Sequence, residues 1–197
     1  MRLIGLCGRS GSGKGMFCKT AEENGFFVID CDKVYKDLVS YPSECLLEIA
    51  ENFGKEVIKD GALDRRYLAP IVFSDSEKLD LLNKITHKYI TSEVHKIISE
   101  VPEDSFVVLD APTLFESGMN ESCDLIIGVV ASDELCISRI VARDNISVQE
   151  AEARLSKQLT VEKIIEYSDC VIYNDSTPED MKNASLSLVN DVKEGSV

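Results

Sequence analysis

Short uninterrupted apolar runs alternate along the chain with longer stretches in which apolar residues recur three or four positions apart. The first pattern is typical of strands buried on both faces, and the second indicates helices with one buried face. The apolar runs predict strands at 3–7, 26–30, 105–110, 124–130 and 170–173. The helical pattern covers 16–23, 33–38, 43–53, 76–99, 133–144, 149–155 and 178–192. This alternation predicts an α/β fold with a five-stranded parallel sheet flanked by helices.

The stretch between the second and third predicted strands is helical for most of its length. We expect one domain over 1–197 in which residues 31–101 form a helical insertion. The rest divides into a core and a second helical region between the last two strands. The core comprises residues 1–30, 102–135 and 168–197, and the second region comprises 136–167.

A glycine-rich loop, Gly8-Arg9-Ser10-Gly11-Ser12-Gly13-Lys14, directly follows the first predicted strand and precedes a helix. Its spacing, G-x-x-x-x-G-K, is that of a phosphate-binding P-loop, whose backbone N–H groups surround phosphate oxygens. Lys14 would carry a positive charge to the terminal phosphates. The motif continues with Ser or Thr as a hydroxyl ligand for magnesium, and this chain has Gly15 there. We expect ATP to contact Gly8, Gly11, Ser12, Gly13, Lys14, Gly15 and Met16.

Three polar residues follow the ends of other predicted strands, where parallel sheets carry their active residues. Asp32 could act as a general base on an attacking hydroxyl, or it could instead cap the next helix. Asp110 fits a carboxylate that holds Mg²⁺ directly or through water, with a strand-end turn as the alternative. Asn174 ends the fifth strand at the same edge.

Cationic residues gather between the last two strands. Arg139, Arg143 and Arg154 could close as a lid over the phosphates and exclude water, or they could form a solvated helix face. Arg139 and Arg143 are like charges four residues apart, which disfavours a helix unless an anion lies between them. Ser147 and Glu150 fit a capping box at the start of one helix in this region.

Composition narrows the class of partner. The net charge of −14 argues against nucleic-acid binding, and no apolar stretch approaches the roughly 18 residues that span a membrane. Seven scattered cysteines without a C-x-x-C pair indicate free thiols in a reducing compartment, and with only two histidines they argue against a zinc site. We therefore expect a cytoplasmic protein.

The motifs occur in the order seen in dephospho-CoA kinases, which the chain resembles over nearly its whole length. The P-loop is the least specific of them. The more discriminating ones are Asp30-Cys31-Asp32, Leu63-Asp64-Arg65-Arg66, Leu82-Asn83 with His87, Asp110-Ala111-Pro112-Thr113-Leu114-Phe115-Glu116, Arg139 to Asp144, Glu150-Ala151 to Arg154, Gln158 and Asp169 to Asn174.

The resemblance implies a P-loop kinase fold similar to nucleoside monophosphate kinases, with a helical acceptor-binding part and a lid. It implies transfer of the ATP γ-phosphate to the ribose 3′-hydroxyl of dephospho-CoA. The expected cofactors are ATP and Mg²⁺, and neither nucleic acid nor a membrane is an expected partner. By position, it makes Asp32 the base, Lys14 the phosphate contact, and Arg139 and Arg143 lid residues. It places Asn174 near the adenine of ATP and Arg65, Arg66 and His87 on the acceptor side, although His87 alone reads as a packed or solvated residue. Asp32 and Asp110 are also expected to contact the substrate. We expect a monomer or a weak homo-oligomer, and a bacterial source.

Four positions depart from the family pattern. Cys31 replaces a common alanine, Lys88 replaces a proline, and Gly15-Met16 replaces serine-threonine. Only Gly15 affects the mechanism, because it removes the expected magnesium ligand. Two alternatives therefore remain open: another small-molecule kinase of the same architecture, or a nucleotide-binding homologue impaired in catalysis by Gly15.

Overall fold

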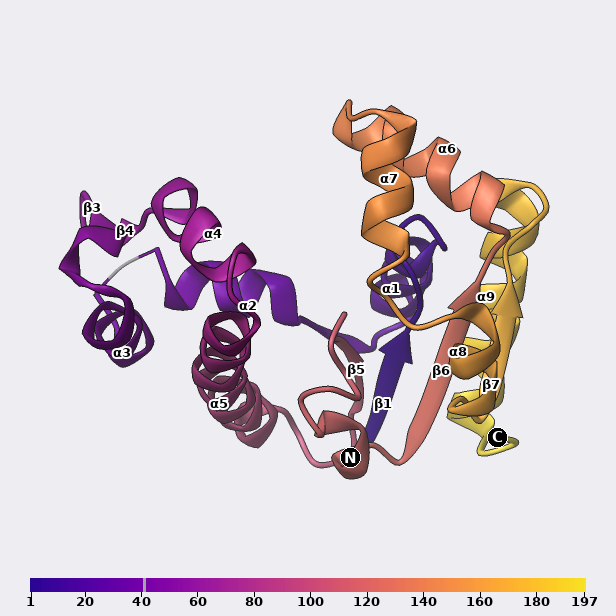
Figure 1. Cartoon of the computed structure of the whole chain (residues 1–197). Coiled ribbons are helices and arrows are strands. Elements are labelled where there is room, and N and C mark those ends of the chain that lie inside the picture. Colours follow the sequence, from indigo (N-terminus) through magenta and orange to yellow (C-terminus); the bar gives the residue numbers. More distant parts are fainter. Residues whose placement is uncertain (41) are drawn as a thin grey trace. The chain divides into compact units, whose positions relative to one another are not determined.

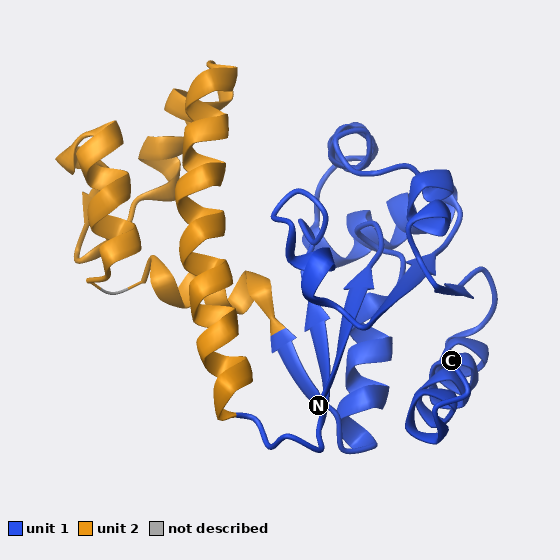
Figure 2. Ribbon diagram, turned by 90° about the horizontal axis from the view of Figure 1, so that it is seen from below, with its two compact units in different colours: residues 1–29, 101–197 blue, residues 30–100 orange. Residues whose placement is uncertain are grey.

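The computed structural model describes residues 1–40 and 42–197. Figure 2 shows two compact units, Met1–Ile29 with Val101–Val197 and Asp30–Glu100. Among the described residues, no helix is both long and apolar enough to cross a membrane. The first unit contains β1 (Arg2–Cys7), α1 (Lys14–Glu23), β2 (Phe27–Asp30), β5 (Phe106–Asp110), η2 (Met119–Ser122), β6 (Leu125–Val130), α6 (Asp133–Asp144), α7 (Val148–Leu155), α8 (Val161–Glu166), β7 (Cys170–Tyr173) and α9 (Pro178–Glu194).

The sheet of the first unit has five strands in the order β2-β5-β1-β6-β7. β1 pairs in parallel with β5 and β6, and β6 pairs in parallel with β7, so the carboxyl ends of these strands share one edge (Figure 1). The predicted five-stranded parallel sheet is confirmed. β1 is central, and the glycine-rich loop that follows it therefore lies in the middle of that edge.

Helices cover both faces of this sheet. Ile4 and Leu6 of β1 belong to a buried cluster with Phe17 of α1 and Val189 of α9. The alternate positions face α8 and the loop after β5, which approach closely. A Cβ on Gly5 would lie 2.9 Å from Leu114 Cδ2, and one on Gly128 would lie 2.5 Å from the Ser168 hydroxyl. Glycine at these two strand positions thus admits the second layer.

Side-chain caps start several helices, as the sequence suggests. Ser147 and Glu150 form the expected capping box on α7, and Thr177 forms another with Asp180 on α9. Each such box satisfies amide groups that a helix cannot pair internally. The sequence pattern did not predict α8, a six-residue helix capped by Thr160.

The second unit is built on one long helix, α5 (Ser76–Glu100), which α2 (Cys31–Leu38), α3 (Glu44–Phe53) and α4 (Arg65–Phe73) all contact. It also holds η1 (Lys55–Val57) and a small hairpin of β3 (Ile58–Lys59) and β4 (Ala62–Leu63). The hairpin and α4 were not predicted. α4 starts with a strong cap, because Asp64 accepts hydrogen bonds from the amides of Arg66 and Tyr67, but Pro70 near its centre hides the helical pattern.

Candidate active site

The conformation of the glycine-rich loop requires glycine at Gly11 and Gly13, among other positions. Gly11 and Gly13 have φ angles of 80° and 112°, which residues with a side chain rarely adopt. There is also no room for a side chain: a Cβ would lie 2.6 Å from the Cys136 carbonyl oxygen at Gly11 and 2.2 Å from Asn174 Nδ2 at Gly13. The loop is therefore pressed against α6 and the end of β7.

The inner side of the loop presents a positive charge and a helix start. Lys14 Nζ folds back over the loop and donates to the carbonyl of Gly8 at 3.0 Å. The N-cap of α1 is Gly13, which has no side chain to cover the helix start. Both features suit an anion, because a helix N-terminus and an ammonium group are both positively charged.

The backbone of the loop is held from outside by Asn174 and Arg139. Asn174, which is buried, donates from Nδ2 to the Ser12 carbonyl at 2.7 Å. Arg139 donates from its two terminal nitrogens to the carbonyls of Gly11 at 3.0 Å and Asn174 at 3.1 Å. Both side chains therefore hold the loop in place. This role differs from the lid role expected for Arg139 and from the adenine contact expected for Asn174.

A second set of contacts joins the tip of the loop to the segment after α7. The Ser10 amide donates to Gln158 Oε1 at 3.0 Å, and Gln158 Nε2 contacts the Ser10 hydroxyl at 3.4 Å. Arg9 pairs with Asp133 of α6 and donates to the Leu155 carbonyl at 3.2 Å. Sequence reasoning missed this arrangement. The presence of Gln158 among the family motifs was its only signal.

Arg143 and Arg154 share one carboxylate. Both guanidinium groups pair with Asp144 at the end of α6, with Arg143 Nε at 2.7 Å. These two partners hold the pKa of Asp144 well below its usual range, and Asp144 in turn raises the pKa of Arg143. The contact joins α6 to α7, so Arg143, an expected lid residue, and Arg154, a possible one, both take part in a structural contact.

Asp110 ends β5 next to the loop, as expected, and contacts α1. Cys18 Sγ donates to Asp110 Oδ2 at 3.7 Å. Burial and the Asp110 charge raise the pKa of Cys18, so this thiol stays protonated and can act as a donor. All seven cysteines are free and none is fully exposed, which confirms the predicted free thiols.

The donor set at Asp110 decides what kind of metal site fits. Within 1–40 and 42–197, no group of three or more His, Cys, Asp or Glu side chains could hold a metal ion. Mg²⁺ is commonly bound by one or two carboxylates together with substrate phosphates. Asp110 therefore fits a magnesium ion that arrives with a nucleotide and does not fit one held by protein alone.

Asp32 lies in the first turn of α2, in the second unit. The alternative that Asp32 caps this helix is wrong, because the N-cap is Asp30, whose carboxylate accepts from the Lys33 amide at 3.0 Å. Asp32 is exposed. One turn further along α2, the Tyr35 ring lies 5.0 Å from the guanidinium carbon of Arg65. Within the second unit, Arg65 of α4 therefore contacts the same helix, α2, that carries the candidate base Asp32.

The remaining acceptor-side candidates also lie in the second unit. Arg65 and Arg66 begin α4 and line a shallow depression together with Lys59. Asp60 and Asp64 line it too, although Asp64 is engaged in capping α4. His87 lies partly buried on α5. The structure therefore groups the phosphate-binding candidates in the first unit and, apart from Asp110, the acceptor-side candidates in the second.

A parallel five-stranded sheet with a lysine-bearing glycine loop after its central strand defines a P-loop kinase fold. A shikimate kinase of Acinetobacter baumannii shares this fold, with a TM-score of 0.55 at 14% identity over 99% of this chain and 94% of that one. The family model for dephospho-CoA kinase matches residues 2–180. The chain belongs to the dephospho-CoA kinase family.

Relatives agree over nearly the full length. A dephospho-CoA kinase of Fusobacterium nucleatum is 39% identical over 180 residues, which are 91% of this chain and 92% of that protein. The structure of a dephospho-CoA kinase from Campylobacter jejuni superposes with a TM-score of 0.74 at 25% identity and covers 100% of both chains. The resemblance stated from the sequence motifs is thus confirmed.

Proposed function

We propose that the protein transfers the γ-phosphate of ATP to the ribose 3′-hydroxyl of dephospho-CoA. The observation that carries this proposal is the family membership over residues 2–180, together with a formed phosphate loop. The arrangement of charged groups in both units is what such a transfer requires, because phosphoryl transfer depends on positioning and charge neutralisation more than on covalent chemistry.

On the donor side, the loop and the start of α1 bind the phosphates, and Lys14 neutralises charge on the terminal one. The present contact of Lys14 with the Gly8 carbonyl is one that a phosphate oxygen can replace. Arg139, Asn174 and Gln158 keep the loop in this shape from outside. They act on the reaction through the loop geometry.

On the acceptor side, Asp32 accepts the proton of the 3′-hydroxyl while that oxygen forms a bond to the γ-phosphorus. The bond from phosphorus to the bridging oxygen of ADP breaks, and ADP leaves with the electron pair. Asp32 suits this role because Asp30 performs the capping of α2 and leaves the Asp32 carboxylate exposed. Lys59, Arg65 and Arg66 offer cations for the diphosphate of the acceptor.

Mg²⁺ bound with ATP neutralises phosphate charge. Asp110 is the residue that would hold it. Gly15 supplies no hydroxyl in the position after Lys14, so the metal relies on ATP oxygens, water and Asp110 in this proposal. We expect a weaker affinity for magnesium as a consequence.

The test is an acceptor panel with product identification by mass spectrometry. Purified protein with ATP and Mg²⁺ receives dephospho-CoA, AMP or shikimate, and Lys14→Ala serves as the inactive control. The proposal predicts that coenzyme A and ADP form only with dephospho-CoA and the unmodified chain. Phosphorylation of another acceptor in preference would identify a different small-molecule kinase. ATP binding without any product at saturating Mg²⁺ would identify an impaired homologue.

A further inference from the structure

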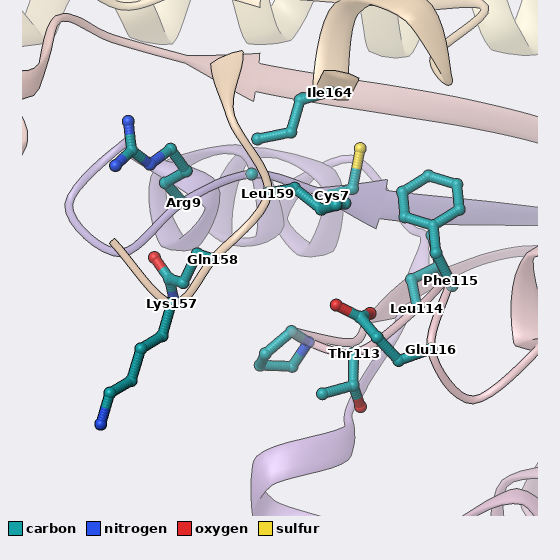
Figure 3. A pocket seen from close by; sticks show the side chains of 12 residues that line it. Cys7, Arg9, Thr113, Leu114, Phe115, Glu116, Lys157, Gln158, Leu159 and Ile164 are labelled. Atoms are coloured by element: carbon teal, nitrogen blue, oxygen red, sulfur yellow. The ribbon is translucent and has the colours of Figure 1, made fainter. Parts of the chain in front are cut away.

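A cavity of about 140 Å³ opens beside the start of the glycine-rich loop (Figure 3). It lies wholly within the first unit. Four segments enclose it: the end of β1 with the start of the glycine-rich loop, the loop after β5, the stretch 157–159, and α8 through Ile164. Sequence reasoning placed no acceptor-binding residue in these segments. We infer that this cavity is the subsite for the adenine ring of the acceptor, an inference that rests on the proposed function.

The position of the cavity points to the acceptor and not to ATP. Gly8 lines it, and the Gly8 carbonyl accepts the hydrogen bond of Lys14 Nζ. The lysine marks where the terminal phosphate of ATP binds. The base of ATP is separated from that phosphate by two further phosphates and a ribose. A group next to the terminal phosphate therefore belongs to the molecule that receives it.

The lining decides which part of the acceptor fits. Leu114, Phe115, Leu159 and Ile164 provide apolar walls. Figure 3 shows the Glu116 carboxylate turned toward the middle of the group, whereas the charged ends of Arg9 and Lys157 point away. A carboxylate in the cavity repels the diphosphate of dephospho-CoA and accepts hydrogen bonds from N–H donors. Adenine is flat, apolar on its faces and carries an amino group, so it matches these walls.

Covalent connectivity favours adenine over the pantetheine arm. The base is attached to the same ribose as the reacting 3′-hydroxyl, two ring carbons away. The pantetheine arm is also apolar in part and has amide N–H donors, but it is joined through the 5′-diphosphate. The observed volume of about 140 Å³ is too small for the whole pantetheine arm.

Glu116 is then the residue that accepts a hydrogen bond from the amino group of adenine. Four proteins test this: the unmodified chain, Glu116→Ala, Glu116→Gln and the control Glu121→Gln. Glu121 lies in the adjacent η2 helix and does not line the cavity. Two acceptors are compared, dephospho-CoA and its purine analogue, in which hydrogen replaces the amino group. The measured quantities are kcat/KM for each acceptor, KM for ATP, and the Kd of dephospho-CoA by calorimetry.

Loss of a hydrogen bond to a charged group should reduce kcat/KM about tenfold or more. The unmodified chain and Glu121→Gln should prefer dephospho-CoA over the purine analogue by this factor. Glu116→Ala should use both acceptors equally and bind dephospho-CoA about tenfold more weakly. Glu116→Gln should retain part of the preference, because its amide oxygen still accepts. KM for ATP should stay unchanged in all four proteins.

Three results would overturn the inference: no preference in the unmodified chain, an undiminished preference in Glu116→Ala, or a raised KM for ATP in the Glu116 variants. The last would assign the cavity to the donor. Failure of the proposed function is distinguishable from these. If dephospho-CoA binds but is not phosphorylated, the calorimetric comparison still decides whether Glu116 reads the base. If it neither binds nor reacts, both the function and the subsite are wrong.

Discussion

The side-chain amide of Asn174 donates a 2.7 Å hydrogen bond to the carbonyl of Ser12, from 162 positions further along the chain. It thereby fixes the backbone of the glycine-rich loop from the end of the edge strand β7. Any disturbance at Asn174 should therefore reach the phosphates of ATP without a direct contact.

Asn174→Ala should weaken both folding and ATP binding. It leaves a buried carbonyl without this donor, which costs about 1–3 kcal/mol and lowers Tm by about 2–4 °C for each kcal/mol in a chain of this size. Thermal melting with and without ATP measures both effects. Asn24→Ala is the matched control, because Asn24 makes a similar 2.8 Å bond to Thr20 at the far end of α1. An unchanged KM for ATP in Asn174→Ala would refute the loop-holding role.

Gly15→Ser should lower the Mg²⁺ concentration needed for half-maximal activity. A Cβ at Gly15 meets no atom within 4 Å, so the serine fits without rearrangement and restores the missing hydroxyl. Gly15→Ala adds the same Cβ without the oxygen and should leave the Mg²⁺ requirement unchanged. If titration of activity against Mg²⁺ gives one curve for all three proteins, Gly15 does not limit metal binding.

Asp32→Asn should depress turnover while ATP binding remains intact. Loss of a general base reduces kcat by about 10²–10⁴-fold. Asp30→Asn removes the same charge two residues earlier, and asparagine caps helices about as well as aspartate, so it should retain activity. Single-turnover measurements with the Kd of ATP in parallel separate the two effects. Near-normal turnover of Asp32→Asn would exclude Asp32 as the base.

Gln158→Leu should raise KM for ATP several-fold, because it removes both contacts to Ser10, each worth about 0.5–1.5 kcal/mol. Gln149→Leu, on the exposed side of α7, is the control for the change of residue type. The comparison requires KM for ATP and for dephospho-CoA in both variants. Equal KM values in the two variants would show that the loop keeps its shape without Gln158.

The pairing of Asp144 with Arg143 and Arg154 should make the first unit less stable as pH falls into the acidic range. The pKa of Asp144 is lowered in the folded state, so its contribution is complete above its unfolded pKa of about 3.9 and disappears as pH falls through the folded pKa. Asp144→Asn should therefore melt below the unmodified chain at pH 7, and the difference in Tm should shrink below about pH 4. A constant difference across this range would contradict the assignment.

The apolar runs predict the strands to within one or two residues because a parallel sheet buries both faces of each strand. The helices with clear periodicity or caps, such as α5 and α9, are predicted for the same kind of reason. α4 is not predicted because Pro70 interrupts its helical pattern. The β3–β4 hairpin is not predicted because strands of two residues are too short to show an alternating pattern.

The candidate site divides in the same way. Lys14 and the loop glycines follow from a local motif, and the structure shows the conformation that requires them. The contacts of Arg139, Gln158 and Asn174 with the loop could not be predicted, because they join positions far apart in sequence. Arg143 and Arg154 show the converse: a cationic cluster in the sequence says nothing of the single carboxylate, Asp144, that pairs with both.

The close packing around Gly128 limits which substitutions this position can accept. The hydroxyl of Ser168 occupies the space where a Gly128 side chain would lie, while it donates to the Ile164 carbonyl at 2.6 Å and lies 3.4 Å from Cys7 Sγ, at the end of β1. A saturation library should therefore find Gly128 as intolerant of change as a substrate-binding residue. Glycine would then be kept at this position because the sheet and α8 pack closely there. Conservation of Gly128 alone would not indicate a catalytic or binding role.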